Sequence, residues 1–425
     1  MKTDIIIRDI ENGKYDEVFI DIYADTACID CQKKRYIDAV KKFEEIYNEK
    51  EVQIFSAPGR CEIGGNHTDH QNGIVLATAI NLDAIGVVSG NSDNKVNIAS
   101  EGFGVIHISL DELGERTDER GSTKALVKGV LSEMSKCGYI VGGFDVYITS
   151  DVPMGSGLSS SASFEVLIGT IISGLYNDMQ ISPVEIAMMG QSAENKYFGK
   201  PCGLMDQMVC AIGNVVLIDF LEIDSIKVEK INIDLDKCGY SLCITDTKGS
   251  HENLTDEYAS IPMEMKNVAK HFGKLTLRGI TKEMLTKDIN VLRETVGDRA
   301  VLRSLHFVTE NDRAYREAEY LKENNIKAFL KEVNASGNSS HKYLQNIYSS
   351  TKVQSQAVTL ALGFSEEILE DDEACRVHGG GFAGTIIAFV KKENEILYIK
   401  EMENIFGAGS CKTLKIRKYG GIKVF

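Results

Sequence analysis

Three clusters of small and polar residues carry the types and spacing needed to act on a phosphate group. The first covers residues 151–163, where glycines and serines lead directly into apolar residues such as Leu167 and Ile171 that recur at helical spacing. Small residues let the backbone approach a polyphosphate, and the free N–H groups at a helix start can donate to its oxygens. The Gly-Lys-Ser/Thr ending of a Walker A loop is absent. The cluster therefore favours a phosphate loop of another type, with a plain linker as the alternative because glycine and serine also favour turns.

The second cluster, residues 57–70, is dense in hydrogen-bonding side chains. Around three glycines it places one cation, two carboxylates, one amide and two imidazoles: Arg60, Glu62, Asp69, Asn66, His67 and His70. Recognition of a sugar needs several oriented donors and acceptors, and transfer of a phosphoryl group needs a cation. Either histidine alone could equally be a hydrogen-bonded turn residue, and the two together make a poor metal set.

The third cluster places Asp206 as the lone carboxylate of the mostly apolar residues 203–208, twelve residues after Glu194. A partly buried carboxylate beside a substrate hydroxyl could accept its proton or orient it. A capped or ion-paired structural aspartate fits the same pattern. Residues 379–384 hold four glycines before an apolar strand, so the backbone must pass close to another group there.

These clusters need strands and helices in both halves of the chain to position them. A length of 425 residues favours two domains, with a junction near residues 215–240. Patterning predicts strands joined by tight turns at residues 52–55, 80–85, 217–220, 241–244 and 385–390, and helices at residues 39–47, 161–176, 312–321, 326–333 and around Tyr343. Residues 1–36 lack a catalytic cluster and are expected to pack on the core as an extension.

The composition restricts the partners. A formal net charge of −15 disfavours binding to nucleic acid or to an anionic membrane, whereas ATP could still bind through a divalent cation and backbone N–H groups. No apolar run reaches the roughly 20 residues that span a bilayer, and the first residues do not resemble a signal peptide. We therefore expect a cytoplasmic protein, for which a monomer is a plausible state. Cys28 and Cys31 form the one C-x-x-C pair among ten cysteines, and without a second ligand pair they are expected to be reduced and structural.

Taken together and in this order, the clusters resemble the galactokinase family of the GHMP kinase superfamily. Residues 60–69 are similar to its signature Gly-Arg-Val-Asn-Leu-Ile-Gly-Glu-His-Thr-Asp-Tyr, and residues 157–163 match its Gly-Leu-Ser-Ser-Ser-Ala-Ser loop. The segments 193–207 and 379–384 match as well. The resemblance implies an α/β (α+β) two-domain GHMP kinase fold with its active site in the interdomain cleft. The expected parts are an extension (1–42), an N-terminal domain (43–220) and a C-terminal domain (221–425).

The resemblance also implies a reaction and the residues that perform it. The chain would transfer the γ-phosphoryl group of ATP to the anomeric hydroxyl of galactose. Arg60 would polarise the transferred group, and Asp206 would be the base, or at least the orienting acceptor, for the hydroxyl. Mg²⁺ would be held by Ser161 and Glu194. ATP would bind at Gly155, Ser156, Gly157, Leu158, Ser159, Ser160 and Ser161, and the sugar at Asn66, His67, Asp69, Gly203 and Tyr258. Among these, Asp69 would bind ring hydroxyls, and the pair at 66 and 67 the exocyclic end.

Four of the departures from the family's sugar signature change the polarity or the size of the side chain strongly. Asn66 replaces glutamate, Glu62 replaces asparagine, Gly64 replaces isoleucine and His70 replaces tyrosine. Because a mispaired buried polar group costs about 1 to 3 kcal/mol, N-acetylgalactosamine, L-arabinose or another hexose are alternative substrates. A mevalonate or homoserine kinase is disfavoured by the sugar motif. A non-catalytic sugar sensor is disfavoured by the intact serine loop.

Overall fold

The computed structural model describes residues 1–102, 104–222, 226–250 and 254–425. Its first half is built on an eight-stranded sheet in the order β12-β1-β2-β5-β3-β4, with β6 pairing β2 and β7 pairing β6. All pairs are antiparallel except β3 with β5. The strands are β1 (Gln53–Gly64), β2 (Ile74–Gly90), β3 (Lys95–Ser100), β4 (Val105–Ser109), β5 (Phe144–Ser150), β6 (Val215–Asp219), β7 (Lys227–Ile231) and β12 (Ile422–Lys423).

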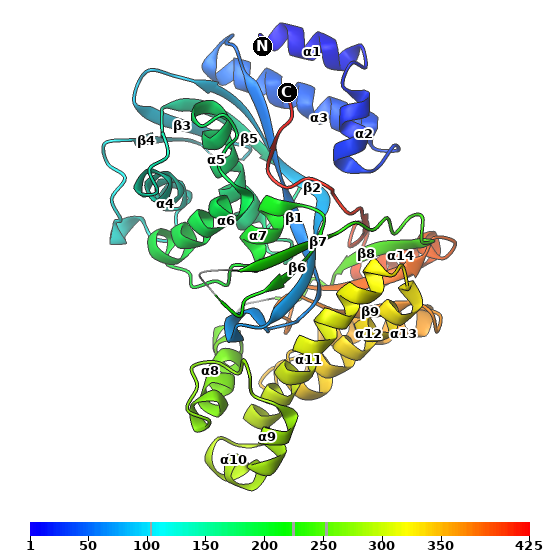
Figure 1. Ribbon diagram of the computed structural model, residues 1–425. Coiled ribbons are helices and arrows are strands. Elements are labelled where there is room, and N and C mark those ends of the chain that lie inside the picture. The colour runs from blue at the N-terminus through cyan, green and yellow to red at the C-terminus, as the bar shows by residue number, and fades with distance from the viewer. Residues whose placement is uncertain (103, 223–225, 251–253) are drawn as a thin grey trace.

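Helices cover both faces of this sheet (Figure 1). On one face lie α4 (Thr123–Lys136), α5 (Ser160–Tyr176), α6 (Pro183–Ser192), the π-helix η3 (Ala193–Phe198) and α7 (Met205–Ile212). On the other lie α1 (Thr3–Glu11), α2 (Asp16–Tyr23) and α3 (Ile29–Tyr47). Successive strand residues point to opposite faces, so Phe55, Val88 and Val146 join the core with α4 to α7, while Ile54, Val87 and Tyr147 join the core with α1 to α3.

The second half has a four-stranded antiparallel sheet in the order β11-β8-β10-β9. Its strands are β8 (Tyr240–Asp246), β9 (Ala374–His378), β10 (Thr385–Lys391) and β11 (Cys411–Leu414). Its helices are α8 (Thr255–His271), α9 (Lys282–Lys287), α10 (Ile289–Thr295), α11 (Asp298–Lys322), α12 (Ile326–Ser339), α13 (Ala357–Ile368) and α14 (Glu395–Phe406), with the π-helix η5 (Ser340–Leu344) continuing α12. Short 3₁₀ turns are η1 (Asp69–Gln71) and η2 (Thr117–Glu119).

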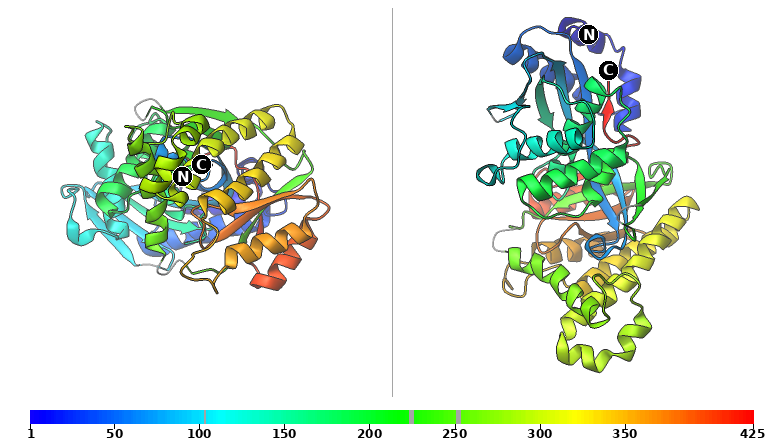
Figure 2. Two further views of the ribbon diagram at one scale, coloured as in Figure 1. Left: turned by 90° about the horizontal axis from the view of Figure 1, so that it is seen from below. Right: turned by 60° about the vertical axis from the view of Figure 1, so that its left-hand side comes forward.

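The chain ends return to the first sheet. β12 pairs with β1, and the Ile54 N–H donates to the carbonyl of Phe425. Both termini therefore lie at the end of the molecule opposite to α9 and α10 (Figures 1 and 2). Within the described residues, no helix combines the length and the apolar character that a bilayer crossing requires.

Most of the predicted elements form, with one local difference. The predicted helix 161–176 is α5, the predicted strands overlap β1, β2, β6, β8 and β10, and the stretch around Tyr343 is the π-helix η5. The strand predicted at residues 52–55 is longer than expected, because β1 continues to Gly64 and carries the sugar signature; the turn before β2 follows it. Irregularities in its pairing with β2 at Pro58/Arg60 and Glu62/Gly64 accommodate the glycines within the sheet.

The predicted end of the N-terminal extension falls inside a helix that packs on the first sheet. α3 passes without a break through residue 42, where the sequence predicts the extension to end. The domain boundaries stay predictions. Cys28 and Cys31 are both free thiols, Cys28 half-buried and Cys31 exposed.

Candidate active site

The first cluster forms a loop between β5 and α5, residues 151–159, called here the serine loop. Gly155 and Gly157 both have φ +74°, a conformation that a side chain would strain. Ser159 precedes α5 with φ +62° and makes no capping bond to its own helix. The first N–H groups of α5 therefore keep their donors for another group, and the Ser159 hydroxyl is free to bond elsewhere.

Arg60 and Asp206 form a two-bond ion pair beside this loop. Arg60 Nε donates to Asp206 Oδ1 at 2.8 Å, and Nη2 donates to Oδ2 at 2.8 Å. Arg60 Nη1 also donates to the carbonyl of Gly157, and the Ser159 hydroxyl donates to Asp206. The Arg60 side chain is 7% exposed and the Asp206 side chain 34% exposed. A buried cation and an accessible carboxylate thus converge with the serine loop at one place, although they lie 146 residues apart in the chain.

The close approach of β1 to the serine loop depends on a glycine. The Arg60 N–H donates to the carbonyl of Leu158 at 3.1 Å, and the Ser163 hydroxyl donates to the carbonyl of Ala57 at 2.8 Å. A Cβ at Gly59 would lie 2.8 Å from the Leu158 carbonyl oxygen. Gly59 therefore lets the strand that carries Arg60 lie against the loop.

Two buried carboxylates lie behind Asp206. The Gln207 amide donates at 2.9 Å both to Glu194 and to Glu165, and Lys200 Nζ lies 3.2 Å from the other Glu194 oxygen. Burial, with a contribution from the charge of Glu194, raises the pKa of Glu165 well above its usual range. Glu165 Oε1 has no hydrogen-bond partner among the described residues.

Glu194 and Ser161 carry the oxygen types that suit Mg²⁺. Mg²⁺ is bound through one or two carboxylates together with substrate phosphates; Glu194 supplies one carboxylate, and Ser161 supplies a hydroxyl from the first turn of α5. Among the described residues, no three or more His, Cys, Asp or Glu side chains form a dedicated metal cluster. The residues therefore fit a cation that arrives with the nucleotide rather than one held by protein ligands alone.

Asn66 is fully buried and its side chain bonds only to the protein. Its Nδ2 donates to Glu62 at 2.9 Å and to the Gly379 carbonyl at 2.8 Å. Its Oδ1 accepts from the Ser340 hydroxyl at 3.2 Å and from the Asn346 amide at 2.9 Å. A side-chain amide has two donors and two acceptor sites, so all four are used. The Asn66 side chain therefore has no unused donor or acceptor for the expected contact with the exocyclic end of a sugar.

Two of the other expected sugar contacts, His67 and Tyr258, bond to the glycine run 379–384. His67 Nε2 lies 3.1 Å from one of its carbonyl oxygens, and the Tyr258 hydroxyl donates to another at 2.7 Å. The Asp69 carboxylate lies against Gly203, where a Cβ would be 2.0 Å from Oδ2. Burial raises the pKa of Asp69, and the charge of Asp206 adds to the effect. The second cluster, residue 203 and the glycine run are thus brought together next to Asp206.

Five residues of this neighbourhood were not predicted from the sequence: Glu165, Gln207, Asn346, Arg376 and His378. Arg376 and His378 alternate with apolar residues in β9 directly before the glycine run, and buried polar residues within an apolar strand are a usable signal. Nothing in the sequence around Asn346 indicates its contact with Asn66.

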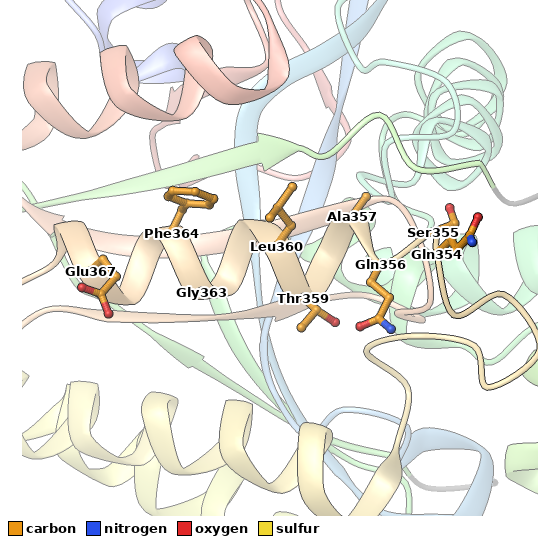
Figure 3. A pocket seen from close by; sticks show the side chains of 9 residues that line it. All are labelled: Gln354, Ser355, Gln356, Ala357, Thr359, Leu360, Gly363, Phe364 and Glu367. Atoms are coloured by element: carbon orange, nitrogen blue, oxygen red, sulfur yellow. The ribbon is translucent and has the colours of Figure 1, made fainter.

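A groove of about 680 Å³ lies elsewhere, along α13 (Figure 3). It is lined by Gln354, Ser355, Gln356, Ala357, Thr359, Leu360, Gly363, Phe364 and Glu367. None of these residues belongs to the Arg60–Asp206 cluster, so the groove is not part of the candidate site.

Known proteins match the chain over all three clusters. The model of the GHMP kinases N terminal domain matches residues 125–214, and the model of the galactokinase galactose-binding signature matches residues 41–90. A galactokinase of Clostridium tetani is 32% identical over 86% of this chain and 90% of its own length. A galactokinase of Actinobacillus pleuropneumoniae is 32% identical over 83% of this chain and 88% of its own length.

The chain belongs to the galactokinase family. Among solved structures, a Lactococcus lactis galactokinase complexed with galactose aligns with a TM-score of 0.76 at 24% identity, over 90% of this chain and 98% of that one. A mevalonate kinase aligns with a TM-score of 0.61 at 16% identity, over 86% and 99%. These structures share the fold, which confirms the predicted GHMP kinase architecture.

The departures from the galactokinase signature compensate one another. Glu62 carries the carboxylate that the family has at position 66, and Arg376 Nη2 binds it at 3.0 Å with no exposure of the Arg376 side chain. Burial still raises the pKa of Glu62 to about 7. At Gly64, a Cβ would lie 1.7 Å from the carboxyl of the buried Glu317. Glu317 therefore occupies the space that isoleucine at position 64 would need.

His378 of β9 is a neutral imidazole that lies between β1 and Thr385 of β10. Its Nε2 accepts from the Glu62 N–H at 3.2 Å, and its Nδ1 bonds to the Thr385 hydroxyl at 2.9 Å. Burial, together with the charges of Arg60 and Arg376, lowers the pKa of His378 well below its usual range.

We expect a measurable pH dependence of stability from His378. As pH falls below about 6.5, the unfolded imidazole binds a proton that the folded one does not, so the histidine's contribution to stability is lost. Replacing His378 by glutamine should remove up to about 1.4 kcal/mol per pH unit from this dependence. Urea unfolding of both proteins between pH 5.5 and 7 measures the difference, and identical slopes would contradict a neutral His378.

Proposed function

We propose that this chain transfers the γ-phosphoryl group of ATP to the anomeric hydroxyl of an aldose, with galactose as the first candidate. The observation that carries the proposal is the two-bond contact between Arg60 and Asp206 beside the serine loop. The relatives at 32% identity are galactokinases, which supports galactose as the substrate to test first.

In the proposed reaction, Asp206 accepts or orients the proton of the sugar hydroxyl, and Arg60 stabilises charge on the transferred group. Phosphoryl transfer depends mainly on in-line positioning and on electrostatic stabilisation. Arg60 meets the second need because its guanidinium is buried and fixed by Asp206 and Gly157, and fixed donors in a site with little water stabilise charge most strongly.

The serine loop and the first turn of α5 would hold the ATP phosphates through Gly155 to Ser161. Left-handed glycines and the start of α5 supply backbone N–H groups for this purpose. Ser161 and Glu194 would hold Mg²⁺, which supplies positive charge that neutralises the phosphates. All ten cysteines are free, which agrees with the reducing cytoplasm that we propose as the compartment.

The sugar would bind mainly through Asp69, with His67, Gly203 and Tyr258 around it. Since all four hydrogen-bonding positions of Asn66 are used within the protein, that end of the pocket offers fewer polar contacts than the family signature implies. N-acetylgalactosamine and L-arabinose therefore remain alternative substrates.

A coupled ADP-release assay with Mg-ATP and a panel of aldoses and amino sugars tests the proposal. We expect turnover with at least one aldose and the highest kcat/KM with galactose. Activity with another sugar and none with galactose would show that the other sugar is the substrate. Absence of turnover with every sugar, at intact ATP binding, would contradict the kinase proposal.

Exchanging the residue types at positions 62 and 66 tests whether these two departures from the signature depend on each other. Replacing Asn66 by glutamate alone places a second carboxylate within hydrogen-bonding distance of Glu62, where one Arg376 is available, and should cost about 1 to 3 kcal/mol of stability. The double variant Glu62→Asn, Asn66→Glu restores one carboxylate and should recover most of that loss. Urea unfolding and the sugar panel measure both effects. A double variant no more stable than the single one would show that the two positions are not coupled.

A further inference from the structure

The N-terminal helices meet the first sheet at one buried carboxylate, Asp83 of β2. Asp83 is fully buried and accepts hydrogen bonds from Tyr23 at 2.9 Å, from Arg35 at 2.6 Å, from Arg417 at 2.7 Å and from the Ser56 hydroxyl. These partners come from α2, α3, the C-terminal segment and β1. Residues from both ends of the chain therefore converge on this point of the sheet.

Arg35 extends this network to the start of the serine loop. Its Nη1 lies 2.6 Å from Asp83 Oδ1 and 3.0 Å from Asp151 Oδ2, and its Nη2 donates to the Asp83 carbonyl at 2.7 Å. The same Asp83 carbonyl accepts from the Asp151 N–H at 2.9 Å. Asp151 directly follows β5, which ends at Ser150. Arg35 thus bridges β2 and the first residue of the loop.

The bridge lies one strand away from Arg60. In the β1–β2 ladder Pro58 is paired with Asp83, two residues before Arg60, whose N–H bonds to Leu158 at the far end of the serine loop. One end of the loop is therefore held by Arg35 through Asp151, and the other end by β1.

We propose that Arg35 is a positioning residue for the nucleotide site, and that the N-terminal extension thereby sets the serine loop for ATP. This inference rests on the proposed function in assigning ATP to that loop. The helices do not need Arg35 to stay packed, because Tyr23 also binds Asp83 and because apolar residues such as Phe19, Tyr36 and Phe43 are fully or almost fully buried against the sheet. The half-exposed Asp151 side chain, by contrast, has its ion pair with Arg35. Loss of Arg35 should therefore act on the loop more than on the fold.

The experiment compares Arg35→Gln, Asp151→Asn and the double variant in the full-length protein. Each single variant is expected to weaken ATP binding about fivefold, by calorimetry and as KM for ATP, while kcat and KM for the sugar change less than twofold. The double variant should be no weaker than the single ones, because both remove the same bridge. Hydrogen exchange of residues 151–159 should accelerate in all three.

Lys33→Gln is the matched control. Lys33 also lies on α3 and pairs with Asp16 of α2 at 3.0 Å, so its loss tests the extension without touching the loop, and ATP affinity should be unchanged. An Arg35→Gln protein with a lower Tm but unchanged ATP affinity and loop exchange would overturn the inference. If Arg35→Gln does not fold, unchanged ATP affinity in Asp151→Asn overturns it. Calorimetry and exchange need no turnover, so an inactive wild-type protein would refute the proposed function and leave this test intact.

Discussion

Replacing Asp206 by alanine is expected to abolish turnover, with kcat lowered by about 10²- to 10⁴-fold, while ATP still binds. The carboxylate is the accessible member of the Arg60–Asp206 pair, and no other carboxylate contacts both Arg60 and the serine loop among the described hydrogen bonds. ATP affinity should persist because the loop is also held by Arg60 and β1. The coupled ADP-release assay and calorimetry with ATP measure the two effects.

Two companion variants sharpen this test. Asp206→Asn keeps an oxygen for Arg60 but cannot take a proton, so it should be nearly as inactive as the alanine variant. Asp219→Ala removes another ion-paired aspartate, bound to Arg278 at 2.9 Å, and should keep normal turnover. Near-normal activity of Asp206→Ala would refute the role proposed for this carboxylate.

Replacing Arg376 by methionine is expected to destabilise the protein by about 3 to 5 kcal/mol, because it leaves Glu62 as a buried carboxylate without its cation. Arg376 is fully buried and donates to Glu62 at 3.0 Å, to the Ile63 carbonyl at 2.5 Å and to the Val377 carbonyl at 3.0 Å. Its loss therefore removes two contacts to β1, the strand that carries the sugar signature. Urea unfolding measures the change in the free energy of unfolding.

Neutralising the partner should rescue part of that loss. In the double variant Arg376→Met, Glu62→Gln no charge is left unpaired, so we expect a more stable protein than Arg376→Met alone. A loss below about 1 kcal/mol in Arg376→Met, or no rescue in the double variant, would show that the ion pair does not support the site.

The local sequence pattern was enough to predict α5, the serine loop and Asp206, but not the residues that contact them in the fold. The spacing of Leu167 and Ile171 predicted α5, and the glycines and serines before it predicted the loop that α5 begins from. Asp206 stood out as one carboxylate in an apolar stretch. Each of these signals lies within a few residues, where helical periodicity and turn chemistry act.

The partners of Asn66 show why the rest could not be predicted. Asn66 bonds to Asn346 and to Gly379, which lie 280 and 313 residues away, and only the tertiary fold brings them together. Hydrophobic periodicity indicates that a residue is buried but not which polar group it meets. Asp83, a lone charge in an apolar strand, carried a usable signal, whereas its partner Arg35 looked like any charged residue on a helix.

The most direct test of the central claim is ³¹P NMR of the product formed from Mg-ATP and galactose. If Arg60, Asp206 and the serine loop form one phosphoryl-transfer site for an anomeric hydroxyl, ADP should appear together with a sugar phosphate whose phosphorus couples to the proton on C1, and Asp206→Ala should give neither. A phosphate on any other carbon, or equal product formation by Asp206→Ala, would contradict the account.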